Sequence, residues 1–210
     1  MIDIALFGLG RIGIMHGKNL MRNKDFNLRY VYDINKNLTK KYSKILKAES
    51  VDNPNIIFKD KKIKSNKNIK YALTHNYSAY PMVRQAKQMI KKGKIGKIEY
   101  INVEYIQDWL KGINITTKNA KKILKWKIDK KIVGSSAVLN EIGSHAYHLA
   151  IYISGLKGHS LFADSKSFSK KIKSDANVQA MVNFKNGAKG MFWISSVPRG
   201  GVYGLKIRIF

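Results

Sequence analysis

The apolar pattern of the first third of the chain predicts alternating strands and helices. Residues 2–7 form a short apolar run, typical of a buried parallel strand, and residues 28–32 form a second β-rich run. Helical spacing follows each run, to about Met21 and then over residues 35–47. Residues 56–58 and 71–74 indicate two further short strands, separated by an exposed lysine-rich segment. The pattern therefore predicts a parallel α/β sheet in this part of the chain.

The pattern changes near residue 76. Helical spacing recurs over residues 79–92, 116–126 and 139–154, whereas residues 98–109, 161–168 and 205–209 alternate as half-buried strands do. Residues 178–184 and 188–195 flank Asn186-Gly187, which predicts a β-hairpin. We therefore expect two domains, 1–76 and 77–210, the second being α+β with a mostly antiparallel open sheet. Because residues 205–209 stop in mid-pattern at Phe210, we expect a chain shorter than its fold.

A glycine motif joins the first predicted strand to the first helix. Residues 8–13 read GxGxxG, and Asp33 follows the last glycine by 20 positions, at the end of the next strand. Such a loop lets a pyrophosphate approach the backbone at a helix N-terminus, and the acid accepts hydrogen bonds from a ribose, which favours NAD over NADP. A purely structural turn is the alternative, and it leaves Asp33 a coincidence. The candidate cofactor-binding residues are Gly8, Gly10, Arg11, Ile12, Gly13 and Asp33.

The predicted helix 139–154 carries a second group of polar residues. Glu141, His145 and His148 lie opposite its apolar stripe, at spacings of four and three. A carboxylate beside an imidazole can make His145 a general base, and the same set could hold a metal ion. From the spacing alone, a polar helix face with locally hydrogen-bonded histidines is the favoured alternative.

Composition limits the other classes of function. The net charge of +27 suggests an anionic partner, but only six of the 40 basic residues are Arg and the lysines are spread along the whole chain. We therefore expect no specific nucleic-acid partner. The chain has no cysteine and no run of apolar residues long enough for a membrane span. With the first strand starting at Ile2 and no room for a signal peptide, we expect a cytoplasmic protein.

Taken in order, several short segments resemble the Gfo/Idh/MocA oxidoreductases, which include glucose–fructose oxidoreductase and inositol 2-dehydrogenase. The resemblance covers nearly all of the chain except about residues 51–70. The run Glu141-Ile142-Gly143-Ser144-His145 is its most specific part, since the glycine motif is common to many families. The other matching segments are residues 2–16, Asp33, residues 80–84, 93–96 and 104–110, and residues 126–129.

The resemblance implies a truncated Rossmann-type domain followed by an incomplete α+β domain whose sheet often serves in homo-oligomers. It implies hydride transfer between NAD, or alternatively NADP, and a sugar or polyol alcohol, with no metal ion. His145 would accept the hydroxyl proton with Glu141 as its partner. Tyr77, Trp126 and Lys127 are the candidate substrate residues, although Tyr77 and Trp126 could equally be ordinary packing aromatics.

Three departures from the family pattern bear on activity. Asp is usual where this chain has Glu141, whose carboxylate lies one methylene further out, and Lys127 replaces a common Arg. The family's Glu-Lys-Pro motif, which holds a catalytic lysine, is missing. It should lie between Asp33 and Tyr71, where only residues 34–70 are available and one βαβ unit needs about 30 residues. We expect weak turnover or none, and the competing hypothesis is a non-catalytic, nucleotide-binding remnant.

Overall fold

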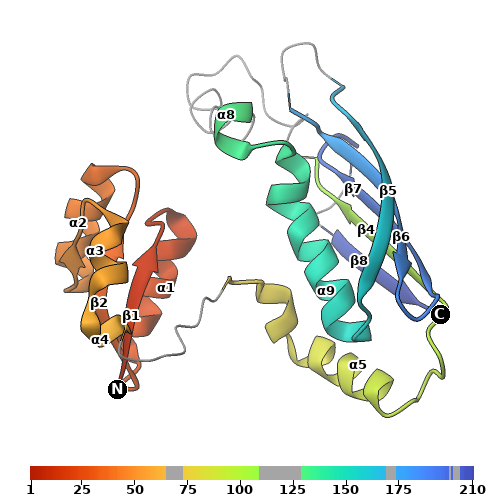
Figure 1. Ribbon diagram of the computed structural model, residues 1–210, viewed down its shortest axis with the longest axis horizontal. Coiled ribbons are helices and arrows are strands. Elements are labelled where there is room, and N and C mark those ends of the chain that lie inside the picture. Colours follow the sequence, from red (N-terminus) through yellow and green to blue (C-terminus); the bar gives the residue numbers. More distant parts are fainter. Residues whose placement is uncertain (65–72, 109–128, 169–173, 199, 201–203) are drawn as a thin grey trace. The chain divides into compact units, whose positions relative to one another are not determined.

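The computed structural model describes residues 1–64, 73–108, 129–168, 174–198, 200 and 204–210 (Figure 1). The chain divides into two compact units, Met1–Leu73 and Thr74–Phe210. Within the described residues, no helix is long and apolar enough to cross a bilayer.

The first unit is built on a parallel sheet. Its described strands lie in the order β1-β2-β3, and β1 pairs with β2 from Ile2↔Phe26 to Phe7↔Tyr32. The elements are β1 (Ile2–Phe7), α1 (Arg11–Arg22), β2 (Phe26–Tyr32), α2 (Lys36–Leu46), β3 (Glu49–Ser50), α3 (Pro54–Lys59) and α4 (Lys61–Lys64). A first strand beside a second, each followed by a helix, with the third strand on the outside, is the first half of a dinucleotide-binding sheet.

A small apolar core holds this unit together. Leu9, Leu28, Val31 and Leu46 are buried in one cluster, which joins the loop after β1 to β2 and α2. The Asn35 side chain accepts a hydrogen bond from the Asn37 backbone N–H and so caps α2. The core therefore fixes the glycine loop against the end of β2.

One predicted strand of this unit is wrong, and another lies half outside the described residues. Residues 56–58 lie in helix α3, because Asn53 caps a helical turn with Pro54 in its first position. The apolar run instead places Ile57 in a buried cluster with Tyr30 and Val51. In the predicted strand 71–74, residues 71 and 72 lie outside the described residues, whereas Leu73 is 78% exposed and Thr74 is not in a strand. An apolar run too short to show a period does not distinguish a strand from a helix.

The second unit carries an open, mostly antiparallel sheet. Its described strands lie in the order β5-β6-β7-β4-β8, and only the β4–β7 pair is parallel among them. The strands are β4 (Tyr100–Ile106), β5 (Gly158–Lys166), β6 (Asn177–Phe184), β7 (Lys189–Ser195) and β8 (Gly204–Ile209). The helices are η1 (Asn76–Ala79), α5 (Pro81–Lys91), α8 (Lys130–Val133), η2 (Leu139–Gly143) and α9 (Ser144–Ser154). The predicted helix 116–126 lies outside the described residues.

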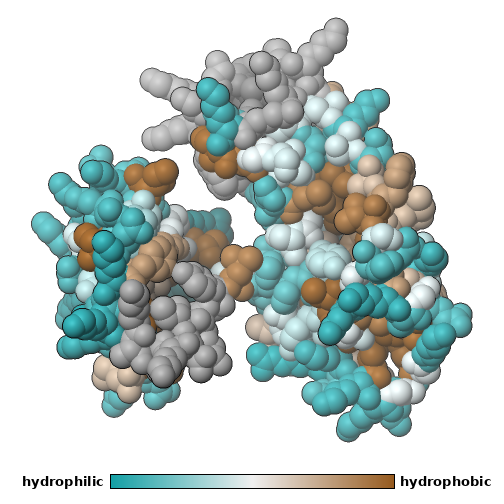
Figure 2. Space-filling model, in the orientation of Figure 1, coloured by the Kyte–Doolittle hydropathy of each residue, from teal (hydrophilic) through white to brown (hydrophobic). Residues whose placement is uncertain are grey.

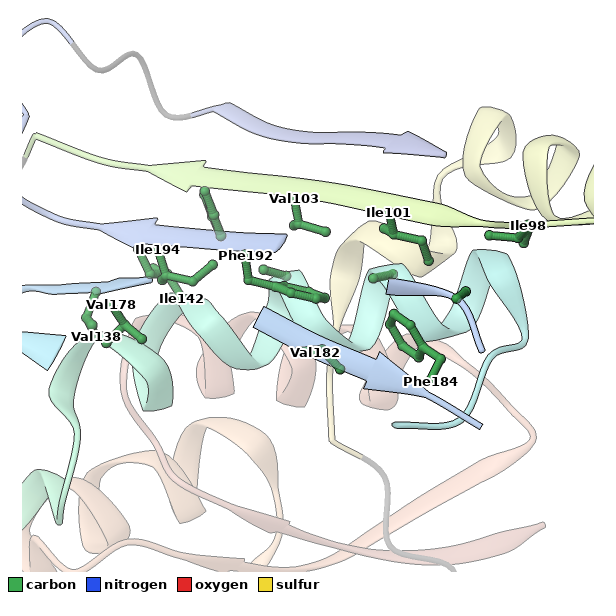
Figure 3. Close-up of a cluster of buried hydrophobic side chains, with 14 residues drawn as sticks. Ile98, Ile101, Val103, Val138, Ile142, Val178, Val182, Phe184, Phe192 and Ile194 are labelled. Atoms are coloured by element: carbon green, nitrogen blue, oxygen red, sulfur yellow. The ribbon is translucent and has the colours of Figure 1, made fainter. Parts of the chain in front are cut away.

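One face of this sheet packs on η2 and α9. Figure 3 shows Ile101 and Val103 of β4 and Phe192 of β7 pointing toward the helical segment that carries Ile142. The β6–β7 hairpin is confirmed, and Gly187 in its turn has a φ of 90°. The fold class is confirmed as well: a parallel α/β sheet is followed by a mostly antiparallel one.

The helix predicted over residues 139–154 differs in its first turn. Residues Leu139–Gly143 form a π-helical turn, and the regular α-helix begins at Ser144. Gly143 and Leu139 are closely packed in this turn, since a Cβ on Gly143 would lie 2.8 Å from the end of the Leu139 side chain. The wider turn leaves Leu139 38% exposed, although it was expected in the apolar stripe. Such π turns inside helices often occur at functional sites.

Candidate functional site

The glycine loop of the first unit has the geometry that its sequence predicts. Gly8 has a φ of 84°, a conformation that glycine adopts at no steric cost. A Cβ on Gly13 would lie 2.8 Å from the Gly8 carbonyl carbon and closer still to its oxygen, so α1 approaches the loop as only glycine allows. A Cβ on Gly10 would meet nothing within 4 Å. The loop therefore packs tightly against α1 at Gly13, whereas the space beside the Gly10 Cα is empty of protein atoms.

Asp33 is held at this loop by backbone hydrogen bonds. The Leu9 N–H donates to Asp33 Oδ2 at 2.7 Å, and the Asn35 N–H donates to Asp33 Oδ1 at 2.8 Å. In turn, the Asp33 N–H donates to the buried Thr39 hydroxyl at 3.0 Å. Each carboxylate oxygen keeps a lone pair that none of these bonds uses. The carboxylate is thus fixed beside the glycine turn and can still accept hydrogen bonds.

These residues fit a dinucleotide. The N-terminus of α1 has no side-chain cap at Gly10 and no acidic residue in its first turn, so the helix end favours an anion. Arg11 and Ile12 are exposed at the same helix start, where Ile12 is 53% exposed. The open side of Gly10 is where a phosphate could approach the backbone. The assignment of these residues to cofactor binding stays a prediction.

In the second unit, His145 and His148 of α9 meet His75, which precedes η1. The His75 ring stacks on His148 with 4.2 Å between ring centroids, and it meets His145 edge-on at 5.0 Å. Tyr77 also meets His145 edge-on, at 5.6 Å. The polar side of α9 is therefore covered by the segment around η1, and it brings together two predicted site residues, Tyr77 and His145.

Burial sets the charge state of these histidines. Desolvation lowers the pKa of His145, and the neighbouring His75 and His148 lower it further. The pKa of His148 is lowered by desolvation first, then by His75 and Lys87. The buried Nδ1 atoms of His145 and His148 have no hydrogen-bond partner within the described residues, unlike locally satisfied surface histidines. Both imidazoles are therefore kept neutral and able to accept a proton near neutral pH.

A short chain of hydrogen bonds leads away from Tyr77. The Tyr77 and Tyr105 hydroxyls lie 2.6 Å apart, and Gln107 Nε2 donates to the Tyr105 hydroxyl at 3.0 Å. Tyr105 is 4% exposed and Gln107 is 9% exposed. Burial, followed by the bond to Tyr77, raises the pKa of Tyr105 above its usual value. Tyr105 therefore stays uncharged near neutral pH.

The remaining predicted site residues are Glu141, Trp126 and Lys127. Glu141 lies in the π-helical turn of η2, and its contact with His145 stays a prediction. Trp126 and Lys127 lie outside the described residues. No group of three or more metal-ligating side chains suited to an ion occurs in the described part of the chain.

Sequence reasoning missed His75, Tyr105 and Gln107. His75 lies only two positions before Tyr77, and that proximity was the available signal. The alternation of β4 places Tyr105 on the buried face with Ile101 and Val103, but nothing in the pattern indicates its hydroxyl partners.

A separate hollow of about 350 Å³ at the start of β5 shares no residue with this cluster; it is lined by Tyr147, Gly158, His159, Ser160, Leu161 and Val182.

The fold and the glycine loop define a Rossmann-type α/β protein with an appended α+β unit. A family model described as the GFO/IDH/MocA C-terminal domain matches residues 83–210, more than half of the chain. The chain therefore belongs to the Gfo/Idh/MocA family, as the resemblance implied.

Two curated relatives give the likeness in sequence. The chain is 30% identical over 142 residues to an uncharacterized oxidoreductase, YfiI, of Bacillus subtilis, covering 65% of this chain and 35% of that protein. It is 34% identical over 90 residues to levoglucosan dehydrogenase of Pseudarthrobacter phenanthrenivorans, covering 43% of this chain and 21% of that protein. The matched part is thus about a third or less of each relative.

Solved structures show the same fold at lower identity. An inositol dehydrogenase homolog from Azotobacter vinelandii, complexed with NAD+, is similar with a TM-score of 0.77 and 19% identity, covering 99% of this chain and 68% of that one. A levoglucosan dehydrogenase complexed with NADH and levoglucosan gives a TM-score of 0.78 and 20% identity, covering 99% and 70%. At this identity the likeness concerns the fold alone.

Proposed function

We propose that this chain is an NAD-linked oxidoreductase acting on an alcohol of a sugar or polyol. The observation that carries the proposal is the Asp33 carboxylate, which the Leu9 N–H holds against an open glycine turn at the start of α1. Family membership supports the reaction class, and the neutral His145 in the second unit supports a base.

Each group has a separate task in the proposed reaction. Gly8, Gly10 and Gly13 shape the turn for the pyrophosphate, with Arg11 and Ile12 beside it, and Asp33 accepts hydrogen bonds from the ribose hydroxyls. A carboxylate at this place disfavours a 2′-phosphate, so we propose NAD as the cofactor, with NADP as the weaker ligand. When bound, the nicotinamide supplies a hydride acceptor.

The substrate side of the site centres on His145. A neutral imidazole can take the proton of a substrate hydroxyl, and Glu141 is proposed to assist it. Tyr77 lies edge-on to that imidazole and is proposed to contact the substrate. Trp126 and Lys127 are proposed as further substrate residues from the family pattern alone. The names of the levoglucosan and inositol dehydrogenase relatives support a sugar or polyol as the substrate class.

A second candidate function is cofactor binding without turnover. The specific observation in its favour is the missing Glu-Lys-Pro motif, since the chain has three prolines and none follows Glu-Lys. Without that lysine, the proposed active form turns over slowly.

Two measurements test the proposal. Calorimetry of the full chain with NAD and with NADP is expected to show binding of NAD, and Asp33→Ala is expected to weaken it. NADH production with a panel of sugars and polyols is expected to be slow and to be lost in His145→Gln, whereas His159→Gln, on the exposed strand β5, keeps it. NAD binding without turnover would favour the second candidate, and no binding of either nucleotide would refute both.

We also propose self-association through the open sheet. Phe162, Met181 and Met191 are opposite one another in register across β5, β6 and β7, and they are 68%, 56% and 44% exposed. Figure 2 shows brown, hydrophobic surface among the teal of the second unit. Analytical ultracentrifugation is expected to show an oligomer that Met181→Lys dissociates. An oligomer unchanged by this substitution would refute the use of this face.

A further inference from the structure

The hydrogen-bond chain Gln107–Tyr105–Tyr77 has a direction. Gln107 follows β4, and its backbone N–H donates to the Ser195 carbonyl at 2.8 Å, which holds it beside β7. Its side-chain Nε2 can only donate, so the Tyr105 oxygen is an acceptor in that bond. The chain therefore begins with a donor that a strand pairing keeps in place.

The buried hydroxyl of Tyr105 accepts from Gln107 and is therefore expected to donate to Tyr77. Tyr105 is 4% exposed, and a buried hydroxyl proton without an acceptor is unfavourable. The Tyr77 oxygen, 2.6 Å away, provides the acceptor. When Tyr105 donates to Tyr77, the hydroxyl proton of Tyr77 does not point back along the chain and remains available to another acceptor.

That available proton lies on a ring in contact with His145. The two rings meet edge-on at 5.6 Å and an interplanar angle of 88°. We propose that Gln107 and Tyr105 are positioning residues that make Tyr77 a hydrogen-bond donor to an oxygen of the ligand beside His145. The ligand class is a hydroxyl-bearing carbohydrate or polyol, so this inference rests on the proposed function.

The two side chains then have complementary tasks at one ligand. His145 accepts a proton from a substrate hydroxyl, and negative charge develops on the oxygen that loses it. A fixed donor at this oxygen or at its neighbour stabilises that charge and also selects ligands that carry the oxygen. Tyr77 touches the ligand, whereas Tyr105 and Gln107 act only through Tyr77.

Two substitutions separate direction from mere packing. In Gln107→Glu, at a pH high enough to ionise this buried acid, whose pKa desolvation raises, the carboxylate can only accept, so Tyr105 donates to it and Tyr77 donates to Tyr105. The Tyr77 proton is then used within the chain. In Tyr105→Phe, Tyr77 loses its partner but keeps its proton available. Gln85→Glu, at an exposed position of α5, adds the same charge and is the matched control.

Nuclear magnetic resonance can determine, without any ligand, which hydroxyl of this chain donates to its neighbour. Tyrosine labelled with carbon-13 at Cζ, in equal parts H2O and D2O, gives a doubled resonance when its hydroxyl is protected from exchange. We expect a doubled resonance for Tyr105 and a single one for Tyr77, both assigned with the two Tyr→Phe variants. In Gln107→Glu the Tyr77 resonance is expected to double, and in Gln85→Glu to stay single. A doubled Tyr77 resonance in the wild type, or a single one in Gln107→Glu, would overturn the inference.

Kinetics tests the contact with the ligand. For a polyol that the wild type oxidises, Gln107→Glu is expected to raise KM about fivefold, as loss of one hydrogen bond implies, and Tyr105→Phe to raise it less. A purely structural role predicts the reverse order, because Tyr105→Phe removes the larger part of the chain. Equal KM in Gln107→Glu and wild type would overturn the donor role. Absence of wild-type turnover would refute the proposed function, while the resonances would still decide the direction of the chain.

Discussion

Alanine substitutions at Gly10 and Gly13 are predicted to separate cofactor binding from stability. The two glycines are three positions apart in one loop, yet their surroundings differ. A Cβ at Gly10 would meet nothing within 4 Å, whereas at Gly13 it would lie 2.8 Å from the Gly8 carbonyl carbon and closer to the oxygen. Gly10→Ala should therefore fold normally and lose NAD affinity, and Gly13→Ala should lose stability first.

The expected magnitudes follow from these contacts. Gly10 is the N-cap of α1, with φ −70° and ψ −176°, a conformation open to alanine, so the stability cost is about 0.5 kcal/mol for a poorer cap. At Gly13 the backbone of the turn must move, and forced overpacking of this kind costs about 2–3 kcal/mol. For a unit of this size that corresponds to a decrease in Tm of roughly 10 °C or more.

Thermal unfolding followed by circular dichroism, together with calorimetric titration of NAD, measures both effects on the full chain. Gly93→Ala is a useful control, because Gly93 has a φ of 72° and open space around its Cβ position in the second unit. Gly93→Ala should lower stability through backbone strain and leave NAD affinity unchanged. The reasoning is refuted if Gly13→Ala melts with the wild type, or if Gly10→Ala binds NAD as tightly as the wild type does.

Three further outcomes are expected. Asp175→Ala removes an acceptor used by the Ser136 hydroxyl and by two backbone N–H groups before η2. In denaturant titrations this substitution should lower the stability of the second unit by about 1–3 kcal/mol, whereas Asp164→Ala, on exposed β5, should leave that stability nearly unchanged. Because burial lowers the pKa of His145 and His148, the unfolded chain binds protons first, so stability should fall as the pH drops below about 6.5; a flat profile would contradict this. Gly187→Ala, at a φ of 90°, should cost about 1 kcal/mol in the hairpin, and an unchanged unfolding midpoint would contradict that figure.

The sequence predicts best where local geometry allows only one residue type. The loop from Gly8 to Gly13 and the turn at Gly187 were found because positive φ and close backbone approach require glycine. The alternation of β4 and the apolar stripe of α9 predict burial correctly at Ile101, Val103 and Ala146. In each case a periodic or steric requirement is visible in the residues themselves.

Prediction failed where neighbours distant in sequence decide the outcome. Residues 56–58 have no period long enough to separate strand from helix, and the cap at Asn53 selects the helix. The apolar spacing of residues 139–154 does not distinguish the π turn at Leu139–Gly143 from a regular α-helical turn. The hydrogen-bond partner of Tyr77 is Tyr105, which lies 28 positions further along the chain, on a strand of the sheet.

In the proposed reaction, a single histidine base in this cluster would be a weak catalyst. Desolvation keeps His145 neutral, which makes it available as an acceptor, but a lower pKa also makes it a poorer acceptor of the substrate proton. A donor next to it offsets this loss, because it stabilises the charge left on the substrate oxygen. In our proposal Tyr77, directed by Tyr105 and Gln107, is such a donor within the same unit. In a family member without the Glu-Lys-Pro lysine, we therefore expect this uncharged hydrogen-bond chain to assist the proposed proton transfer.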